Sequence, residues 1–257
     1  HVSIGSLPIV YYGTVKQKEK YLPKIATAEI KTAYALTEPS AGSDANSGKT
    51  KASIDKEKNC YLINGQKMWI TNSGFAEVFI VFAKIEDDEK LSAFIIEKSF
   101  GGITLGEEEK KLGIKGSSTR QVYFENCPVP MENLLGKRND GFKIALNILN
   151  SGRIKLSAAT IGGSKFALSK AVKYSIEREQ FGKSIGEFTA MQFKIGEMAR
   201  KIFSAESAVY RTGRNIDLKE KELKELVLEW LQSPVNINIK YVDSFPNYKH
   251  EEFISLI

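Results

Sequence analysis

Hydrophobic and polar positions follow three different rhythms along the chain. Residues 2–12 are largely apolar and predict the end of a buried element, and a short charged helix is predicted to follow and to stop near Pro23. From about residue 32 to 130, short β-prone runs alternate with Gly-rich and acidic turns, which predicts a compact β-barrel or sandwich. After residue 130 the pattern becomes helical.

Within the strand-rich part, the Asn64-Gly65 dipeptide lies between β-prone flanks and predicts a two-residue hairpin turn. Three further runs are predicted strands because they are rich in β-branched and aromatic residues. They cover residues 78–85, 92–98 and 120–127.

Two long helices are predicted at the end of the chain, over residues 141–178 and 189–215. In the second, a near-heptad apolar stripe favours core packing against neighbouring helices. In the first, Gly162 and Gly163 should each cost about 1 kcal/mol relative to Ala. A close approach of another helix or of a ligand could compensate for that cost.

Composition narrows the possible functions. The net charge is +6, but 31 acidic residues are mixed with 37 basic ones, which favours a solvated mixed surface over nucleic-acid binding and leaves nucleotides open. Only two histidines are present, which argues against Ser–His catalysis and histidine-rich metal sites. Two cysteines favour a reducing, intracellular compartment, and no run of about 18 apolar residues predicts a membrane span.

Two segments carry candidate chemistry. "AYALTEPSAGSDA" (33–45) offers hydroxyls and backbone N–H groups, and "KMWITNS" (67–73) offers the flat Trp69 followed by Thr71. A flavin nucleotide needs this set of stacking area, ring-edge donors and a phosphate cradle. The alternative is a surface turn and a strand with a half-buried Trp, and chemistry alone leaves it open.

The two segments, together with "GIKGSSTRQVYFENCPVP" (113–130) and "SIEREQFGKSIGEFTAMQFKIGEMA" (175–199), resemble the acyl-CoA dehydrogenase family in order and spacing. The resemblance covers about residues 2–215 and is nearest to long- and very-long-chain members. It implies an α+β fold with the end of an α-helical domain (1–31), a middle β-barrel domain (32–136) and the start of a C-terminal helical bundle (137–257).

The resemblance also implies an FAD-dependent oxidoreductase that dehydrogenates fatty acyl-CoA thioesters in β-oxidation. Expected partners are acyl-CoA, an electron-transferring flavoprotein and further copies of the chain in a tetramer or dimer. The expected compartment is the cytoplasm in a bacterium or the mitochondrial matrix in a eukaryote. An acyl-CoA oxidase and a non-catalytic flavin- or CoA-binding assembly factor are the alternatives.

Site residues follow from the resemblance by position. Ser43, Asn150 and Arg153 are expected to contact acyl-CoA, Ser43 also the cofactor, and Thr71 is expected near the flavin N5 edge. Arg178 is expected to offer a planar cation to the pyrophosphate of a neighbouring subunit's FAD. The full expected cofactor set is Leu36, Thr37, Ser43, Trp69, Ile70, Thr71, Arg178, Gln180, Phe181, Phe188 and Thr189.

No catalytic residue is assigned. The family's base is a Glu followed by Gly-Thr, and this sequence contains no Glu-Gly pair; the alternative position, before Arg153, is Gly152. The tail from about residue 225 does not match the family. The chain is therefore expected to be an incomplete family member and inactive by itself, through truncation with a foreign tail or through divergence to a non-catalytic role.

Overall fold

The computed structural model describes residues 4–232, with side chains described up to residue 219. The chain divides into two compact units, His1–Gly152 and Arg153–Ile257. The first unit contains the sheet and two short helices, and the second is helical. A division at residues 31 and 136 stays a prediction.

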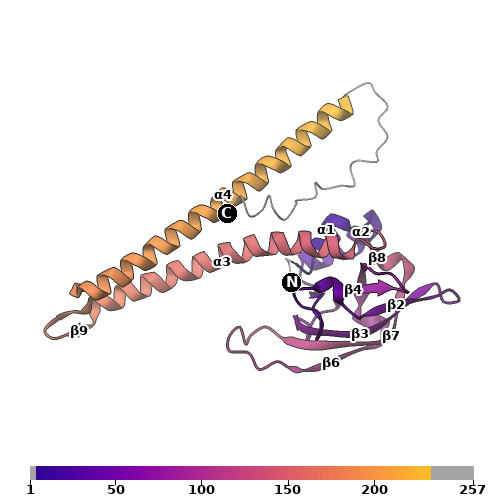
Figure 1. Cartoon of the computed structure of the whole chain (residues 1–257), viewed down its shortest axis with the longest axis horizontal. Helices are drawn as coiled ribbons and strands as arrows, with labels where there is room; N and C mark the ends of the chain where they lie inside the picture. The colour runs from indigo at the N-terminus through magenta and orange to yellow at the C-terminus, as the bar shows by residue number, and fades with distance from the viewer. Residues whose placement is uncertain (1–3, 233–257) are drawn as a thin grey trace. The chain divides into compact units, whose positions relative to one another are not determined.

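The first unit is built on one eight-stranded mixed sheet (Figure 1). Seven of its strands follow the order β6-β7-β3-β2-β4-β5-β8, and the eighth, β1, lies off this path and pairs with β4. The first strand, β1, lies parallel to the first half of β4, and β2 pairs parallel with the end of the same strand. The strands are β1 (Thr32–Ala35), β2 (Lys51–Asp55), β3 (Cys60–Thr71), β4 (Val78–Ile85), β5 (Leu91–Glu97), β6 (Ile103–Glu108), β7 (Thr119–Pro130) and β8 (Leu134–Leu135). The strands predicted at 78–85, 92–98 and 120–127 are confirmed as β4, β5 and β7.

Strands β4 and β5 are buried on both faces because each face is covered by its own hydrophobic cluster. One cluster joins Phe79, Val81 and Phe94 to side chains of β3 and β7. The other joins Ile80 and Ile95 to the helices α1 (Leu7–Tyr12) and α2 (Val15–Ala26) and to the first turns of α3 (Gly141–Glu177). This double burial explains their continuous apolar sequences.

The hairpin predicted at Asn64-Gly65 is wrong. Strand β3 runs straight through this dipeptide, and its pairing with β7 shifts register between Ile63 and Gly65. The side chain of Asn64 accepts a hydrogen bond from the backbone N–H of Asn126 on β7 (2.8 Å) instead of shaping a turn. Gly65 has φ +151° and contacts Thr50 so closely that a Cβ would clash with it. The dipeptide forms a bulge.

The predicted stop at Pro23 is also wrong, because α2 continues to Ala26 with Pro23 inside it. The helix begins with a capping box, in which the Thr14 side chain accepts from Gln17 N and the Gln17 side chain accepts from Thr14 N. Tyr21 and Ile25 flank the proline and are buried in the core, which offsets the missing helical hydrogen bond.

The second unit contains the rest of α3, a small hairpin of β9 (Glu179–Gln180) and β10 (Lys183–Ser184), and α4 (Thr189–Gln232). The helix predicted at 141–178 is confirmed, and the one predicted at 189–215 extends farther. A salt bridge between Lys165 and Glu206 joins α3 to α4. Among the described residues, no helix combines the length and the apolarity that crossing a membrane requires. The prolines of the tail lie outside the described residues.

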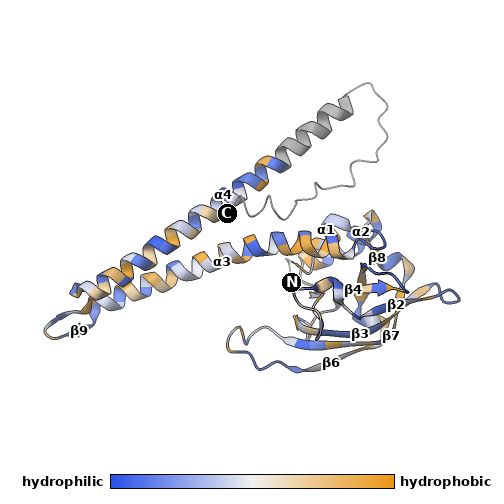
Figure 2. Ribbon diagram, viewed as in Figure 1, coloured by the Kyte–Doolittle hydropathy of each residue, from blue (hydrophilic) through white to orange (hydrophobic). Residues whose placement is uncertain are grey.

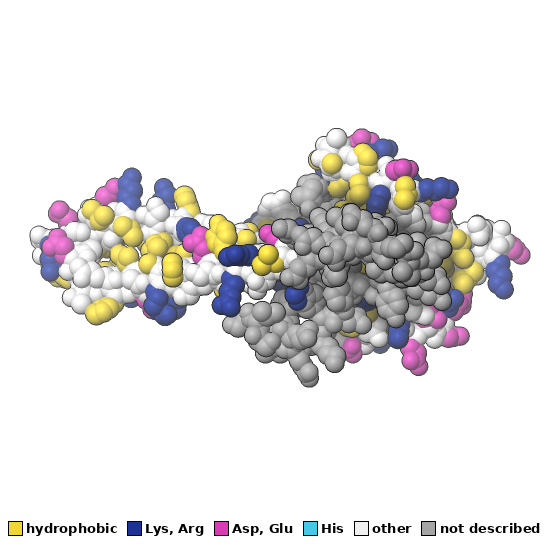
Figure 3. Space-filling model, turned by 90° about the horizontal axis from the view of Figure 1, so that it is seen from above, with side chains coloured by type: hydrophobic (Ala, Val, Ile, Leu, Met, Phe, Trp, Pro, Cys, Tyr) yellow, Lys and Arg dark blue, Asp and Glu magenta, His cyan; other side chains and the backbone are white. Residues whose placement is uncertain are grey.

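Apolar residues are spread along both helices (Figure 2), and many of their side chains remain exposed (Figure 3). The stripe predicted to pack in a helical core is only half-buried at Met191, Ile195, Ile202 and Val209. Outside this stripe, the most exposed large apolar side chains of the two helices are Leu156, Phe166, Tyr174, Ile176, Phe193, Phe203 and Tyr210. No atom beyond the helix's own backbone lies within 4 Å of a Cβ placed at Gly162 or Gly163, so no described neighbour compensates for these glycines.

Both cysteines are reduced and buried in the sheet, Cys60 at the start of β3 and Cys127 on β7. Burial raises the pKa of the Cys127 thiol to about 12. Because both thiols are buried, neither is accessible to a substrate in the folded protein.

Candidate functional site

A cleft of about 390 Å³ opens beside strands β1 and β3 in the first unit. It brings together the two segments in which the sequence places its candidate chemistry: Leu36 and Thr37 from one, and Trp69, Ile70 and Thr71 from the other. The remaining lining residues are Ile4, Gly5, Thr32, Tyr34, Gly42, Asn72 and Leu149. Ser43, which follows Gly42, is exposed and is not part of the lining.

Trp69 is held in an unusual conformation at this cleft. The φ angle of Trp69 is +56°, in the left-handed region that large residues rarely adopt, and 61% of its surface is exposed. The conformation comes from a second irregularity of β3, where the pairing with β7 shifts between Lys67 and Ile70. Backbone strain of this kind costs about 1–3 kcal/mol and gathers at binding sites.

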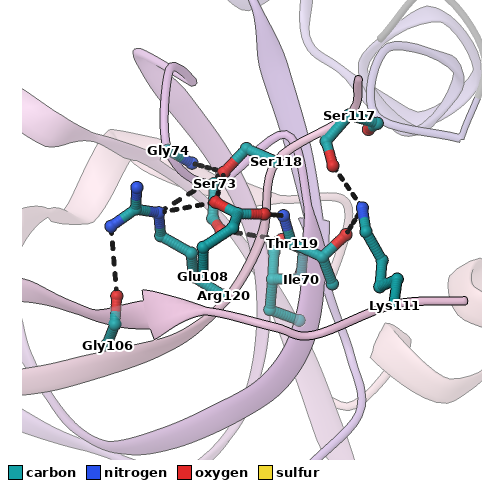
Figure 4. A network of polar contacts seen from close by, with 10 residues as sticks. All are labelled: Ile70, Ser73, Gly74, Gly106, Glu108, Lys111, Ser117, Ser118, Thr119 and Arg120. Carbon is teal, nitrogen blue, oxygen red and sulfur yellow. Dashed lines mark hydrogen bonds and ion pairs between the residues drawn. The ribbon is translucent and has the colours of Figure 1, made fainter. Parts of the chain in front are cut away.

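A network of polar contacts holds the strand end that carries Trp69 (Figure 4). Glu108 on β6 accepts hydrogen bonds from Ser118 Oγ (2.8 Å) and from the Nε of Arg120 (3.0 Å). Ser118 in turn accepts from the backbone N–H of Gly74, in the turn directly after β3 (3.2 Å). The Thr119 N–H bond, the other donors and the Arg120 charge lower the pKa of Glu108.

The loop after β1 is fixed from the other side of the cleft. The Thr37 carbonyl accepts a hydrogen bond from the backbone N–H of Met68 (2.8 Å), one residue before Trp69. Glu38 and Ala41 exchange backbone hydrogen bonds of 3.0 and 3.1 Å, which closes the loop tightly. The loop and the strand therefore present Thr37 and Trp69 as one connected surface.

A buried ion pair lies behind this surface. Lys67 Nζ is 2.6 Å from Glu38 Oε1, and the two side chains are only 1% and 4% exposed. Nζ also donates to the carbonyls of Leu36 (3.2 Å) and Phe82 (2.7 Å). Glu38 accepts further hydrogen bonds from the backbone N–H groups of Lys49 and Thr50.

The two partners respond differently to burial. Burial lowers the pKa of Lys67 to about 8, and the attraction of Glu38 offsets only part of this shift. Burial also acts to raise the pKa of Glu38, but the Lys67 charge and the hydrogen bonds outweigh it, so the pKa of Glu38 is lowered. The folded structure thus stabilises the charged form of Glu38 and disfavours the charged form of Lys67.

A second group of expected site residues lies in the helical unit, around the hairpin of β9 and β10. Phe181 (φ +54°) and Gly182 (φ +75°) form its two-residue turn, with positive φ at both positions as a type I′ turn requires. Phe181 is 94% exposed, so a second large aromatic residue is held in a left-handed conformation at the surface.

The hairpin is bonded to the end of α3 and contacts the segment directly before α4. The Arg178 carbonyl accepts from the N–H of Ile185 (2.8 Å), and Ser184 Oγ donates to the Ser175 carbonyl (2.6 Å). The rings of Phe181 and Phe188 meet edge to face at 6.3 Å. The side chains of Arg178, Gln180 and Thr189 are exposed beside this pair.

Two of the three expected acyl-CoA residues lie on α3, where Asn150 is half-buried and Arg153 is exposed; the third, Ser43, lies in the loop after β1. Between them, Gly152 is half-buried, and a Cβ at this position would lie 3.0 Å from Ile4 Cγ2. The structure thus groups the expected cofactor residues into two sets, one in each unit, and leaves Ser43 outside the lining of the cleft.

Sequence reasoning did not identify Glu38 and Lys67 as a pair, nor Thr32, Tyr34 and Leu149 as cleft residues. A lysine within a strand is normally solvent-exposed, so local pattern gives no sign of its burial. The one available signal is the opposite charge in the loop that the strand must contact.

Known proteins match both parts of the chain. Residues 33–127 match the model for the acyl-CoA dehydrogenase middle domain, and residues 139–229 match the model for its C-terminal domain. A probable acyl-CoA dehydrogenase of Bacillus subtilis is 50% identical over 90% of this chain, and the very long-chain specific acyl-CoA dehydrogenase of Rattus norvegicus is 45% identical over 87%.

Among solved structures, an acyl-CoA dehydrogenase complexed with FAD from Bacillus anthracis superposes with a TM-score of 0.80. It is 53% identical and covers 82% of this chain, which spans 37% of that protein. The sheet and the helix pair therefore have the fold of acyl-CoA dehydrogenase domains. The chain belongs to the acyl-CoA dehydrogenase family. It spans 38% and 35% of the length of its Bacillus and rat relatives.

Proposed function

We propose that the cleft of the first unit binds the isoalloxazine ring of FAD. The observation that carries this proposal is Trp69, a strained and exposed indole that flanks a cleft lined by Thr37 and Thr71. Aromatic area for stacking and hydroxyls for the ring edge are what a flavin ring requires. The FAD complex of the relative from Bacillus anthracis supports the same cofactor.

The cleft suits the ring by size and by chemistry. A volume of about 390 Å³ lies at the lower end of the range for small-molecule pockets, so it accommodates a fused ring system and only part of a dinucleotide. The remainder of FAD would need other groups. Arg178, Gln180, Phe181, Phe188 and Thr189, grouped at the hairpin of the helical unit, are proposed to serve the FAD of another subunit in a dimer or tetramer.

For the whole protein we propose α,β-dehydrogenation of fatty acyl-CoA thioesters in β-oxidation, with electrons passed to an electron-transferring flavoprotein. Bound FAD would supply the two-electron oxidant. In this chain, Thr71 would orient the ring edge, Ser43 would contact both ligands, and Asn150 and Arg153 would contact acyl-CoA. The bacterial and mitochondrial relatives support a cytoplasmic or matrix location.

Removal of the α-proton requires a positioned carboxylate, and its loss typically lowers the rate about 10²- to 10⁴-fold. The sequence has no Glu-Gly pair, and residue 152 is a glycine. We therefore propose that this chain by itself binds FAD weakly and turns over acyl-CoA negligibly. Anaerobic mixing with saturated acyl-CoAs tests this: flavin bleaching at the rate of a complete dehydrogenase would contradict it.

The cofactor proposal is tested by titrating the chain with FAD and with riboflavin, followed by tryptophan quenching and the visible flavin spectrum. Trp69→Leu should lose most of the spectral shift because the stacking surface is removed. Phe75→Leu is the matched control, since Phe75 is also an exposed aromatic, 42% accessible, but does not line the cleft. Equal effects of the two substitutions would refute the assignment.

A further inference from the structure

The peptide that joins Leu36 to Thr37 lies between the cleft and a buried cation. Its carbonyl accepts a hydrogen bond from Lys67 Nζ at 3.2 Å. Because a trans peptide is planar, the N–H of Thr37 points the opposite way, away from Lys67. No described residue accepts a hydrogen bond from this N–H, and both residues of the peptide line the cleft. The peptide can therefore donate to a molecule bound there.

The ammonium group of Lys67 is bonded to several separate segments of the chain. Lys67 and Glu38 connect four segments of the chain. These are β3, the loop after β1, β4 through the Phe82 carbonyl, and the backbone before β2. A buried ion pair gives little net stability, because desolvation cancels most of its attraction. Its cost is easier to understand if the pair also serves the cleft in front of it.

We propose that Lys67 and Glu38 form a positioning pair for the flavin ring, in which Glu38 holds Lys67 and Lys67 orients and polarises the Leu36–Thr37 peptide as a ring donor. This inference rests on the flavin site proposed above. Hydrogen bonding of the carbonyl to an ammonium group polarises the peptide and strengthens its N–H as a donor. A polarised donor also favours the reduced ring over the oxidised ring, because reduction places additional electron density on the ring.

The same pair constrains the stacking residue. Lys67 and Met68 are bonded to the loop at Leu36 and Thr37, and the left-handed Trp69 follows at once. If the bonds to the loop are lost, the bulge that turns Trp69 outward loses its support on one side. The pair therefore acts on both halves of the cleft, the ring-edge donor and the aromatic face.

The test compares three variants of the full chain by their dissociation constants for oxidised and reduced FAD. Lys67→Met removes the cation. The double variant Lys67→Met/Glu38→Gln removes both charges, and its single amide oxygen still accepts from one of the N–H groups of Lys49 and Thr50. Tyr21→Phe is the control, because it breaks buried hydrogen bonds to Glu97 and Asn133 away from the cleft.

Reduced FAD should bind both Lys67 variants about 10- to 100-fold more weakly, the range for one lost interaction with a charged group, and oxidised FAD should lose less. Tyr21→Phe should change neither constant. A purely structural pair predicts something else: the double variant, which leaves no charge buried alone, would regain both stability and wild-type affinities. That result would overturn the proposal.

A ligand-free measurement separates this inference from the flavin assignment. The chain has two tryptophans, so Trp230→Phe leaves Trp69 as its only tryptophan. In that background, with excitation that selects tryptophan over tyrosine, Lys67→Met should change the acrylamide quenching of Trp69, whereas Tyr21→Phe should not. Unchanged quenching would overturn the positioning role even if FAD binds. Altered quenching without any FAD binding by the parent chain would instead overturn the flavin site.

Discussion

Replacing Gly65 with alanine tests how closely β3 must approach the segment that holds Glu38. An added Cβ would lie 2.6 Å from Thr50 Oγ1 and 2.8 Å from Thr50 Cα. The Cα belongs to the backbone and cannot rotate away, so the strands must separate. Thr50 also donates its N–H to Glu38 at 3.1 Å, so the displacement would reach the ion pair behind the cleft.

Two effects add in this substitution. Overpacking a tight site costs about 1–3 kcal/mol. A side chain at φ +151° is strained as well, by about 1–3 kcal/mol for a backbone region that only glycine visits readily. Gly65→Ala should therefore destabilise the first unit by about 4 kcal/mol and lower its melting temperature by roughly 8–16 °C.

Gly101→Ala is the matched control. Gly101 has φ +81° and ψ −179°, and no atom lies within 4 Å of its added Cβ, so only the backbone strain should appear. Urea and thermal unfolding of both variants, followed by circular dichroism, measure the difference. Equal losses of unfolding free energy would refute the reasoning, because they would mean that the contact with Thr50 imposes no constraint.

Four further predictions concern the site, the assembly and the helices. Thr71→Val should weaken FAD binding about 2- to 10-fold and shift its visible spectrum, since one hydrogen bond is worth about 0.5–1.5 kcal/mol. Arg178→Ala should weaken FAD binding and self-association together, as measured by sedimentation with and without FAD; a monomer that binds FAD tightly would contradict the shared site. Gly162→Ala should raise the stability of the helical unit by about 1 kcal/mol in thermal unfolding, because nothing approaches its added Cβ. Between pH 8 and 10.5 the unfolded chain binds more protons at Lys67 than the folded chain, because burial lowers the pKa of Lys67 from 10.5 to about 8. The stability of the native chain relative to Lys67→Met should therefore rise with pH in this window, by up to about 1.4 kcal/mol per unit; a falling difference would show the opposite shift.

Local pattern was sufficient where one physical effect dominated. Strand β4 was predictable because a continuous apolar run with turns on either side fits burial on both faces. The long helix α3 was predictable from its apolar spacing. The meeting of the loop at Thr37 with the strand at Trp69 was expected from the motifs, and the cleft lining brings them together.

Elsewhere a distant partner overrode the local preference. Asn64-Gly65 favours a turn in isolation, but Asn126 and Thr50 supply contacts that keep it inside a strand. Pro23 disfavours a helix interior, yet the buried side chains around it keep the helix intact. The burial of Lys67 depends on a carboxylate 29 positions earlier in the chain, and no window around residue 67 contains that information.

The two buried thiols make it possible to measure how often the paired strands β3 and β7 open. Cys60 and Cys127 lie on β3 and β7, and neither can react with a thiol reagent until the strands open, since only the exposed thiolate is nucleophilic. The rate of labelling under native conditions therefore reports how often this part of the sheet unfolds. A molecule that binds at Trp69 should slow that rate in proportion to its occupancy, so the natural cysteines can reveal a ligand that has no colour of its own.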